Sequence, residues 1–459
     1  PATLDGLNLL TAKSRLLGLL RISKFRYKMH AKGADTIVLQ LGSQNLRVGF
    51  ATEQPITVPN VIAYLSQAQP KQQVQPYDAE GLFRACNIVQ EYLSSVGYLK
   101  ETKPKILLPK KRSKRKNEVQ IDTPVPMETE LVVEFPLRFS DVSNRPMCLI
   151  GEDALNIAST EPYVKHWPIL RGHLNVNEFQ SLQSVLSDLE RIIEHTLSRK
   201  LRVPRERFDR ISVVLLIPDL FYRYQVRALV DLLLRTLGFR SIFLLQESVA
   251  ALYGAGVPSA CVVDIGAEQV TVTCIDEGVL LPVSVVTQTT AGRSADQLLL
   301  KLLRPDSVSG EELRAAEALK IRCSRFIQQD NEDSVTWFIN PREEVRLNSY
   351  NTALTISAHS LFHPSLLTIA MPVRKTSLVL HPSLAYDIDD YLEDLAEGRK
   401  SEDSVTPIHP ESKPLSLDSL IIKSICAVPT ADIRKKLANN VILTGGGAMI
   451  PDIVEVLED

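Results

Sequence analysis

The chain has 459 residues, of which 44% are hydrophobic and 23% charged, and its formal net charge is −2. That length allows two or three domains with a sizeable core. The near-neutral charge excludes a general attraction to nucleic acid or to a membrane surface, so either kind of binding would need a local patch. No apolar run approaches the ~20 residues that span a bilayer, and no secretory signal is recognisable. The six cysteines are scattered without metal-ligand spacing, which predicts reduced thiols in a cytosolic or nuclear protein.

Residues 1–35 form an N-terminal arm ahead of the regular structure. Leucines alternate with basic residues between Leu7 and Ile22, which predicts an amphipathic helix. A basic cluster follows at Lys24, Arg26 and Lys28. Two interpretations stay open for it: a solvated tail, or an arm that faces DNA or a partner protein.

A short pattern occurs twice, about two hundred residues apart. The first copy, TIVLQLGSQNLRVGF, begins at Thr36, and the second, ACVVDIGAEQVTVTC, begins at Ala260. Each copy is an apolar β-rich run, a glycine-containing turn and an alternating strand. Two such hairpins facing each other can hold the phosphates of one nucleotide from both sides. The copies are unequal at a position that matters for chemistry, because the second has the acid Asp264 where the first has Gln40.

Regularity breaks down from about residue 67 to 147, which we interpret as an insertion that contains a helix near Tyr77 to Leu93 and a mobile loop. Its loop is strongly basic and fits a nuclear-import signal or a nucleic-acid contact, although a solvated charged loop is the alternative. The basic residues concerned are Lys110, Lys111, Arg112, Lys114, Arg115 and Lys116.

Strands and helices then alternate, which favours an α/β fold with a largely parallel central layer. Helices are predicted for Phe179 to Leu197, Arg223 to Leu237 and Ser248 to Tyr253, with strands at Ser212 to Ile217 and Ser241 to Leu245. Because the second hairpin repeats the start of this plan, we expect two similar lobes, 36–258 and 259–459, with a cleft between them.

The second lobe is predicted to contain helices from Gly292 to Leu303, Gly310 to Phe326 and Leu415 to Ala427. Residues 328–414 look irregular and partly disordered, and we interpret them as a second insertion. The apolar run that begins at Asn440 ends in three glycines, which allow close approach of the backbone to a ligand.

These motifs together resemble the actin superfamily. The resemblance spans about Thr36 to Val456 and leaves out the two insertions and the arm. The matching runs, in the order of the family, are GS at Gly42, VGFA at Val48, HWPILRG at His166, VLLIPD at Val214, QESVAALYGAG at Gln246, VDIG at Val263, AGR at Ala291, DIRKKL at Asp432 and LTGGGAMIP at Leu443. The resemblance implies a two-lobed, duplicated ribonuclease H-like ATPase fold with large insertions. It also implies a C-terminal segment that returns to the first lobe, and none is found after Asp459.

The resemblance further implies an ATP or ADP site in the cleft. One phosphate hairpin would be lined by Gly42, Ser43 and Arg47, and the other by Asp264 and Gly266. Gly292 and Arg293 would approach the ribose. The adenine would be bordered by Gly445, Gly446, Gly447 and Met449.

The sequence departs from the family where hydrolysis is carried out. Gln40 and Ala267 stand where actin has acids, and Glu247 replaces the glutamine that positions the attacking water. Phosphoanhydride hydrolysis depends on positioning and on charge stabilisation around a metal, and a carboxylate beside a triphosphate adds like-charge repulsion. Ile321 replaces a glutamate near the base, and Gln44 and Glu268 replace turn glycines. We therefore expect no catalytic residue and no metal site, with a nucleotide held structurally or an empty cleft.

The resemblance is nearer to a nuclear actin-related protein than to actin itself. It implies a non-enzymatic scaffold subunit of a nuclear ATP-dependent chromatin remodeller. Its partners would be actin, another actin-related protein, a helical segment of the motor subunit, linker DNA and histones of the nucleosome, with no membrane. The alternatives are an active actin-like ATPase and, less in keeping with the motifs, a sugar or metabolite kinase with the same core.

Overall fold

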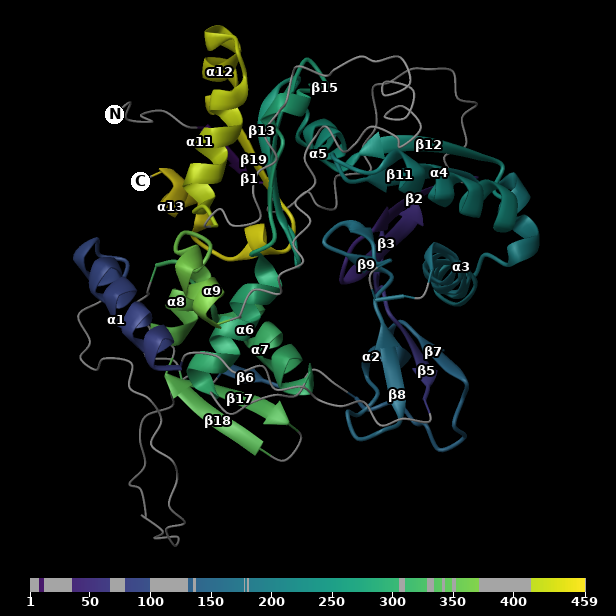
Figure 1. Ribbon diagram of the computed structural model, residues 1–459, viewed down its shortest axis with the longest axis horizontal. Helices are drawn as coiled ribbons and strands as arrows, with labels where there is room; N and C mark the ends of the chain where they lie inside the picture. Colours follow the sequence, from purple (N-terminus) through teal and green to yellow (C-terminus); the bar gives the residue numbers. More distant parts are fainter. Residues whose placement is uncertain are drawn as a thin grey trace, which may run out of the picture.

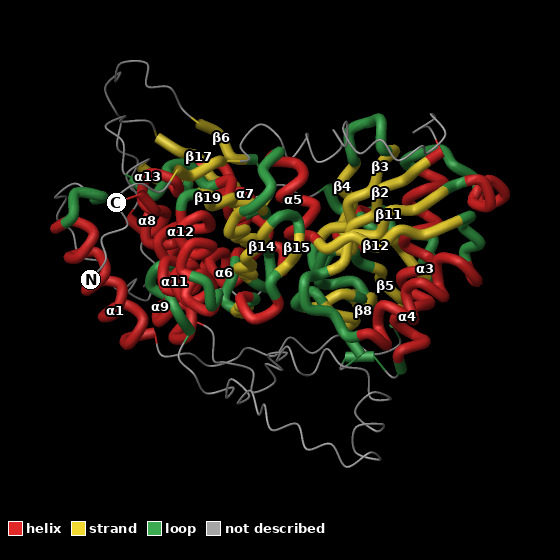
Figure 2. Tube along the Cα trace, turned by 90° about the horizontal axis from the view of Figure 1, so that it is seen from above, coloured by secondary structure: helices red, strands yellow, loops and turns green. Residues whose placement is uncertain are grey.

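The chain folds into two α/β lobes that lie side by side in the computed structural model of the protein (Figure 1). Seen from above, the strands of the first sheet gather on one side and helices α6, α9, α11 and α12 on the other (Figure 2). The structure describes residues 8–11, 35–66, 79–99, 131–134, 138–176, 178–179, 181–304, 310–327, 334–340, 343–348, 352–370 and 414–458. No helix among these residues is long and apolar enough to cross a membrane.

The first lobe is built on a five-stranded sheet in the order β12-β11-β2-β3-β4. Its strands are β2 (Thr36–Leu41), β3 (Asn45–Phe50), β4 (Ile56–Pro59), β11 (Ser212–Ile217) and β12 (Ser241–Gln246). Strands β11 and β12 run parallel to β2, whereas β3 forms the predicted antiparallel hairpin with it. Their alternating apolar side chains pack against α3 (Leu182–Arg199) and α4 (Arg223–Asp231). The 3-10 helix η3 (Arg205–Arg210) leads into β11, and α4 continues as the π-helix η4 (Leu232–Thr236).

The second lobe repeats this plan. Its sheet has the order β1-β19-β13-β14-β15, with β16 also paired to β14. The bounds are β13 (Ala260–Ile265), β14 (Val270–Asp276), β15 (Val279–Leu280), β16 (Val286–Gln288) and β19 (Asn440–Thr444). The helices α11 (Leu417–Ala427) and α12 (Ala431–Ala438) belong to one apolar cluster of this lobe, and α5 (Glu247–Ala255) belongs to another. Short turns of helix follow at η5 (Pro282–Ser284), η7 (Gly447–Met449) and α13 (Ile453–Glu458).

The helix predicted for Leu7 to Ile22 is wrong over its described part. Residues Asn8–Thr11 form strand β1, which pairs in parallel with β19 and places Asn8 opposite Asn440. An edge strand presents unpaired backbone N–H and C=O groups, and pairing at the edge of β19 satisfies them where local periodicity favoured a helix. The remaining residues of the arm, among them Lys24, Arg26 and Lys28, lie outside the described residues.

The prediction that residues 328–414 are irregular is wrong for their first half. They contain the antiparallel hairpin of β17 (Ser334–Asn340) and β18 (Glu343–Asn348), followed by α8 (Thr352–His359) and α9 (Pro364–Ala370). These elements pack with α6 (Gly292–Leu303) and α7 (Gly310–Cys323) around the fully buried Trp337. Trp337 donates its ring N–H to the carbonyl of Ala315 over 3.0 Å, so a long-range contact orders a segment without a strong local pattern.

A smaller three-stranded sheet, in the order β7-β5-β8, extends the first lobe. It consists of β5 (Ile62–Leu65), β7 (Cys148–Ile150) and β8 (Tyr163–His166), with α2 (Glu152–Leu155) beside it. The two-residue strands β9 (Ile169–Leu170) and β10 (His173–Leu174) form a further hairpin nearby.

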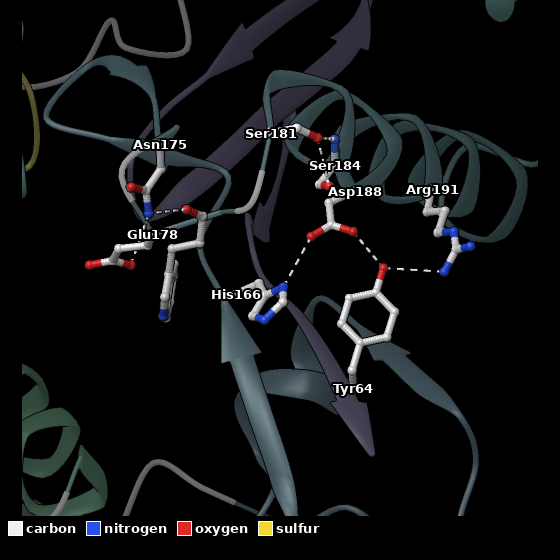
Figure 3. Close-up of polar contacts among 9 residues, drawn as sticks. Tyr64, His166, Asn175, Glu178, Ser181, Ser184, Asp188 and Arg191 are labelled. Carbon is white, nitrogen blue, oxygen red and sulfur yellow. Dashed lines mark hydrogen bonds and ion pairs between the residues drawn. The ribbon is translucent and has the colours of Figure 1, made fainter. Parts of the chain in front are cut away.

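Buried polar contacts join this small sheet to helix α3 (Figure 3). The carboxylate of Asp188, which is buried, accepts a hydrogen bond from the Tyr64 hydroxyl and lies 3.4 Å from Nδ1 of His166. Arg191 donates to the same tyrosine oxygen over 3.2 Å. Burial and the neighbouring Asp188 both raise the pKa of Tyr64, so the phenol stays protonated and keeps donating.

The insertion that begins after β5 crosses from the first lobe to the second. Helix α1 (Ala79–Ser95) lies beside α8 and α9 (Figure 1), and strand β6 (Leu131–Val133) pairs in parallel with β17. Buried side chains of α1, Leu82 and Leu93 among them, join the apolar cluster of the second lobe. The chain then returns to the first lobe at β7. We call α1 and β6 the crossing elements.

Candidate functional site

The first predicted phosphate hairpin has a tight turn at Gly42. Its N–H donates to the carbonyl of Asn45 over 3.0 Å, and a Cβ atom at Gly42 would lie 2.5 Å from that oxygen. Only glycine is accommodated there. The hydroxyl of Ser43 accepts a 3.1 Å hydrogen bond from the N–H of Gly172, so the HWPILRG run supports the turn.

The second hairpin is joined to the start of helix α6. The N–H of Gly266 donates to Gln269 over 2.9 Å, while Gly292 and Arg293 donate their N–H groups to the carbonyls of Gly266 and Ala267. The first N–H groups of a helix are the ones that lack partners within the helix. Here two of them bind protein carbonyls at the place where the sequence predicted an approach to ribose.

The late glycine turn packs directly on the second hairpin. Gly445 has φ 87°, which favours glycine, and a Cβ atom there would lie 2.4 Å from Oδ1 of Asp264. Met449, by contrast, is 65% exposed, and so is the nearby family departure Ile321 at 63%. The turn thus fits close against Asp264, whereas the two side chains predicted near the base face solvent.

Between the hairpins lies a cavity of about 40 Å³ that is lined by both polar and apolar side chains. Arg47, Asp264 and Gly445, all predicted site residues, line it together with Gln40 and Glu247. A guanidinium nitrogen of Arg47 donates to the side-chain oxygen Oε1 of Gln40 over 3.1 Å. The side-chain nitrogen Nε2 of Gln40 in turn donates to the carboxylate of Glu247 over 2.7 Å. The two positions that depart most from the family therefore contact each other.

The carboxylates of this cavity resist ionisation. Burial raises the pKa of Glu247 to about 8, with the neighbouring Asp264 acting in the same direction and the Gln40 hydrogen bond against it. Burial also raises the pKa of Asp264 to about 6, helped by Asp219 and opposed by Arg47. An added anion such as a phosphate would raise these values further.

Sequence reasoning did not single out Asp219, although it lines the same cavity. Its carboxylate accepts hydrogen bonds from the N–H (3.2 Å) and the hydroxyl (2.6 Å) of Ser248, at the start of α5, and from the hydroxyl of Thr273 (2.6 Å) in the second lobe. Burial raises its pKa, and these bonds lower it. An acid that directly follows Pro218 at the end of a buried strand was the available signal.

Side chains at the hairpin tips connect the two lobes directly. The Gln44 amide donates a 2.6 Å hydrogen bond to Glu317 on α7. Glu268, in the other turn, lies 3.4 Å from Arg293, whose guanidinium lies 5.7 Å from the ring centre of Trp167. Gln44 thus reaches across the cleft, whereas Glu268 contacts Arg293 within the second lobe and Arg293 in turn reaches Trp167 of the first. These contacts border a second cavity of about 230 Å³, also lined by Lys165 and Arg314.

Helix α7 is fixed to the first turns of α6 by a buried ion pair. The ammonium group of Lys320 lies 2.6 Å from Asp296 and donates to the carbonyl of Gly292 over 2.8 Å. Both side chains are almost fully buried. Burial raises the pKa of Asp296 to about 6, although Lys320 opposes the shift.

The residues present do not fit a metal-dependent hydrolytic centre. Among the described residues, no group of three or more His, Cys, Asp or Glu side chains is arranged to hold a metal ion. The Gln40 amide, which could face a metal-bound water, is engaged by Arg47 and Glu247. The predicted DNA-contacting residues from Lys110 to Lys116 lie outside the described residues, as do those of the arm.

The family model described as Actin matches residues 31–332. With the repeated hairpins and the two lobes, this match shows that the chain belongs to the actin family. Within that family it is similar to actin-related protein 8. The protein of that name from Salmo salar is 34% identical over 259 residues, which are 53% of this chain and 40% of that protein. The human one is 32% identical over 259 residues with the same coverage, and the probable actin-related protein 8 of Schizosaccharomyces pombe is 30% identical over 290 residues, 58% of this chain and 43% of that protein.

A solved structure, described as human actin-related protein Arp8 in its ATP-bound state, has the same fold. It superposes with a TM-score of 0.67 and 24% sequence identity, and the match covers 94% of this chain and 84% of that chain. The matched part amounts to about 40% of the length of the vertebrate relatives. The expected actin-like, two-lobed α/β fold is thereby confirmed.

Proposed function

We propose that this protein is a non-catalytic scaffold subunit of a nuclear, ATP-dependent chromatin remodeller. In that role it would pack on a helical segment of the motor subunit together with actin and another actin-related protein. It would also help the assembly bind linker DNA and the histones of the nucleosome. Membership of the actin family and the similarity to actin-related protein 8 support the proposal.

The observation that carries the non-catalytic part is the hydrogen bond between Gln40 and Glu247. Hydrolysis of a phosphoanhydride needs positioned charges around the transferred group. Here Gln40 places a neutral amide where the family has an acid, and Glu247 places a carboxyl with a raised pKa where the family has a glutamine. A protonated Glu247 cannot accept a proton from water, and an ionised one repels the triphosphate.

The cleft is proposed to hold ATP or ADP as a structural ligand. The support is the human Arp8 structure, which is described as ATP-bound, together with the glycine turns that face each other here. Binding would have to widen the cavity of about 40 Å³ and separate Arg47 from Gln40, so we expect modest affinity.

Phosphate release by the purified protein tests the catalytic part. We expect no turnover above background with Mg²⁺ and ATP, while a fluorescent ATP analogue binds and is displaced by ADP. The variant Asp264→Asn serves as the matched comparison, since it removes the one acid that the family pattern retains. Turnover in the natural protein that Asp264→Asn abolishes would show an active ATPase.

The scaffold part is tested by co-purification with the motor subunit's helical segment and actin. The DNA part is tested by a gel-shift titration in which Lys24, Arg26 and Lys28, or the basic residues from Lys110 to Lys116, are changed to alanine. We expect weaker binding by folded variants, with a smaller salt dependence than that of the natural protein. Unchanged affinity in both variants argues against DNA contacts by the arm and the basic loop.

A further inference from the structure

Basic residues gather at the end of the first lobe that lies opposite the cleft. Residues 199–240 contain ten Lys or Arg and four Asp or Glu, whereas the whole chain has a net charge of −2. The exposed basic side chains of this end are Arg199, Lys200, Arg202, Arg205, Arg207, Arg210, Arg235 and Arg240. We call this set the arginine face.

Sheet topology brings these residues together. In the parallel strands β2, β11 and β12, Ser212 lies opposite both Thr36 and Ser241, so the amino ends of the strands meet at one edge. Their carboxyl ends lead instead to Gln40 and Glu247 in the cleft. Arg210 and Arg240 stand just before β11 and β12, and the N–H of Arg240 donates to the carbonyl of Ile211 over 2.9 Å.

Helix ends contribute the rest of the arginine face. Helix α3 ends at Arg199, and the N–H of Val203 returns to Leu197 over 2.9 Å, which holds the following turn close. The guanidinium of Arg205 donates to the carbonyl of Thr236 over 2.9 Å, so the end of η4 lies beside η3. Contacts between η3, the end of η4 and the start of β12 therefore bring exposed basic side chains of separate segments close together.

Part of this charge is neutralised within the protein and part is not. Arg205 pairs with Glu190 and Glu194, Lys200 with Glu152, and Arg235 with Asp231. Within the described ranges, no ion pair involves Arg202, Arg207 or Arg210. Arg202 also has φ 56°, a left-handed conformation that favours glycine, so a charged side chain is kept where backbone preference disfavours it.

We propose that the arginine face binds the phosphate backbone of duplex DNA without sequence preference. The inference rests on the proposed DNA-binding role and names a surface for it besides the arm and the basic loop. Guanidinium groups match phosphate oxygens in a two-pronged geometry, and duplex DNA carries one charge per about 1.7 Å of axis. A protein partner would call for an apolar anchor. Phe208, which lies between the arginines of η3, is fully buried. Leu234 beside Arg235 is 38% exposed, however, and Phe243 near Arg240 is 62% exposed, so a comparison with polyglutamate distinguishes DNA from a protein partner.

Fluorescence anisotropy of a labelled blunt-ended duplex of about 30 base pairs tests the proposal at increasing KCl. The test variant is Arg202→Gly/Arg207→Ala/Arg210→Ala. Its first change relieves a backbone preference and the other two are at exposed positions, so we expect the variant to fold, which circular dichroism checks. The control, Arg84→Ala/Lys423→Ala/Lys435→Ala, removes the same charge from exposed positions of α1, α11 and α12.

We expect the test variant to bind about tenfold more weakly at 0.1 M KCl, with a salt slope lower by about 2 to 3, while the control stays within about twofold of the natural protein. If the test variant binds DNA like the control, the arginine face is not a DNA-binding surface. If the arm and loop variants still lose binding in that case, the proposed function stands. Failure of the natural protein to bind the duplex overturns both. A test variant that loses binding to polyglutamate but not to DNA assigns the face to acidic protein segments instead.

Discussion

The amide of Gln40 donates a 2.7 Å hydrogen bond to the carboxyl of Glu247, and these are two positions at which the sequence departs from the family pattern. Gln40 is the penultimate residue of strand β2, whereas Glu247 begins the helix that leads to the second lobe. The pair lies in the cavity between the two hairpins and engages groups that would otherwise face a ligand. The two substitutions thus act together as one internal contact.

The raised pKa of Glu247 predicts a pH-dependent stability. An unfolded glutamate titrates near 4.5, whereas the folded one titrates at about 8. Between these values the folded state retains a proton that the unfolded state releases, so the free energy of unfolding falls as pH rises through this window. The variant Glu247→Gln keeps the hydrogen bond from Gln40 without an ionisable group. We expect it to be more stable than the natural protein by about 1 to 2 kcal/mol at pH 8 and about equal at pH 5.

Thermal unfolding followed by circular dichroism from pH 5 to pH 8 measures this difference. The exposed Glu206→Gln serves as the control and should follow the natural protein. Parallel stability profiles for Glu247→Gln and the natural protein would contradict a raised pKa.

The buried pair of Lys320 and Asp296 predicts a large asymmetry between single and double variants. Lys320→Met leaves the Asp296 carboxylate buried without its cation, and we expect a loss of about 3 to 5 kcal/mol. Lys320→Met/Asp296→Leu removes both charges and should regain most of that loss. Urea denaturation at pH 7 gives both values. Equal losses in the single and double variants would mean that the pair does not compensate two buried charges.

The contact between Gln44 and Glu317 predicts how the cleft opens. Gln44→Gly removes a 2.6 Å hydrogen bond between the lobes and should cost about 0.5 to 1.5 kcal/mol. We also expect faster hydrogen exchange in both hairpins, and faster association of a fluorescent ATP analogue. Gln54→Gly, at an exposed position of the same lobe, is the control. Exchange rates identical to those of the control would show that the lobes are held together elsewhere.

Packing of α1 on the second lobe predicts different outcomes for its two faces. Leu82→Ala removes a fully buried side chain from the second-lobe cluster and should cost about 2 to 5 kcal/mol. Ile88→Ala, on the same helix but 67% exposed, should change stability by less than about 0.5 kcal/mol. Chemical denaturation distinguishes the two, and similar small losses would place α1 away from the lobe.

Elements whose conformation follows from a short sequence pattern were predicted correctly. The hairpin at Thr36, the strand at Ser212 and helix α6 follow from alternation, from an apolar run and from helical spacing. Strands β1 and β6 were not predicted, because each is short and gains its conformation by pairing with a strand more than two hundred residues away. Val132 and Val133 of β6 do favour a strand, but both segments are too short for their own residues to predict one.

The candidate site, like the fold, could be predicted from the sequence only where a local motif marks it. Glycine and acid motifs located both hairpins and the turn at Gly445, and the missing acids were visible as Gln40 and Ala267. The partners of the bulky turn residues were not, because Gln44 meets Glu317 only once the lobes are assembled, and Glu268 meets Arg293 only once α6 packs against the second hairpin. The arginine face was hidden for the same reason: its members are spread over 42 positions of the chain, from 199 to 240, and meet at one sheet edge.

The crossing elements have a consequence for the order in which the molecule can form. Helix α1 ends at Ser95, yet apolar residues it packs against, such as Leu354 and Leu366, come much later in the chain. During synthesis from the amino terminus, the apolar face of α1 must therefore wait until more than 250 further residues have emerged. Contacts of such long sequence separation slow folding, and an exposed apolar helix invites association with chaperones or other chains. The second lobe therefore cannot mature as an independent unit, because the chain that leaves the first lobe at Leu65 completes its core.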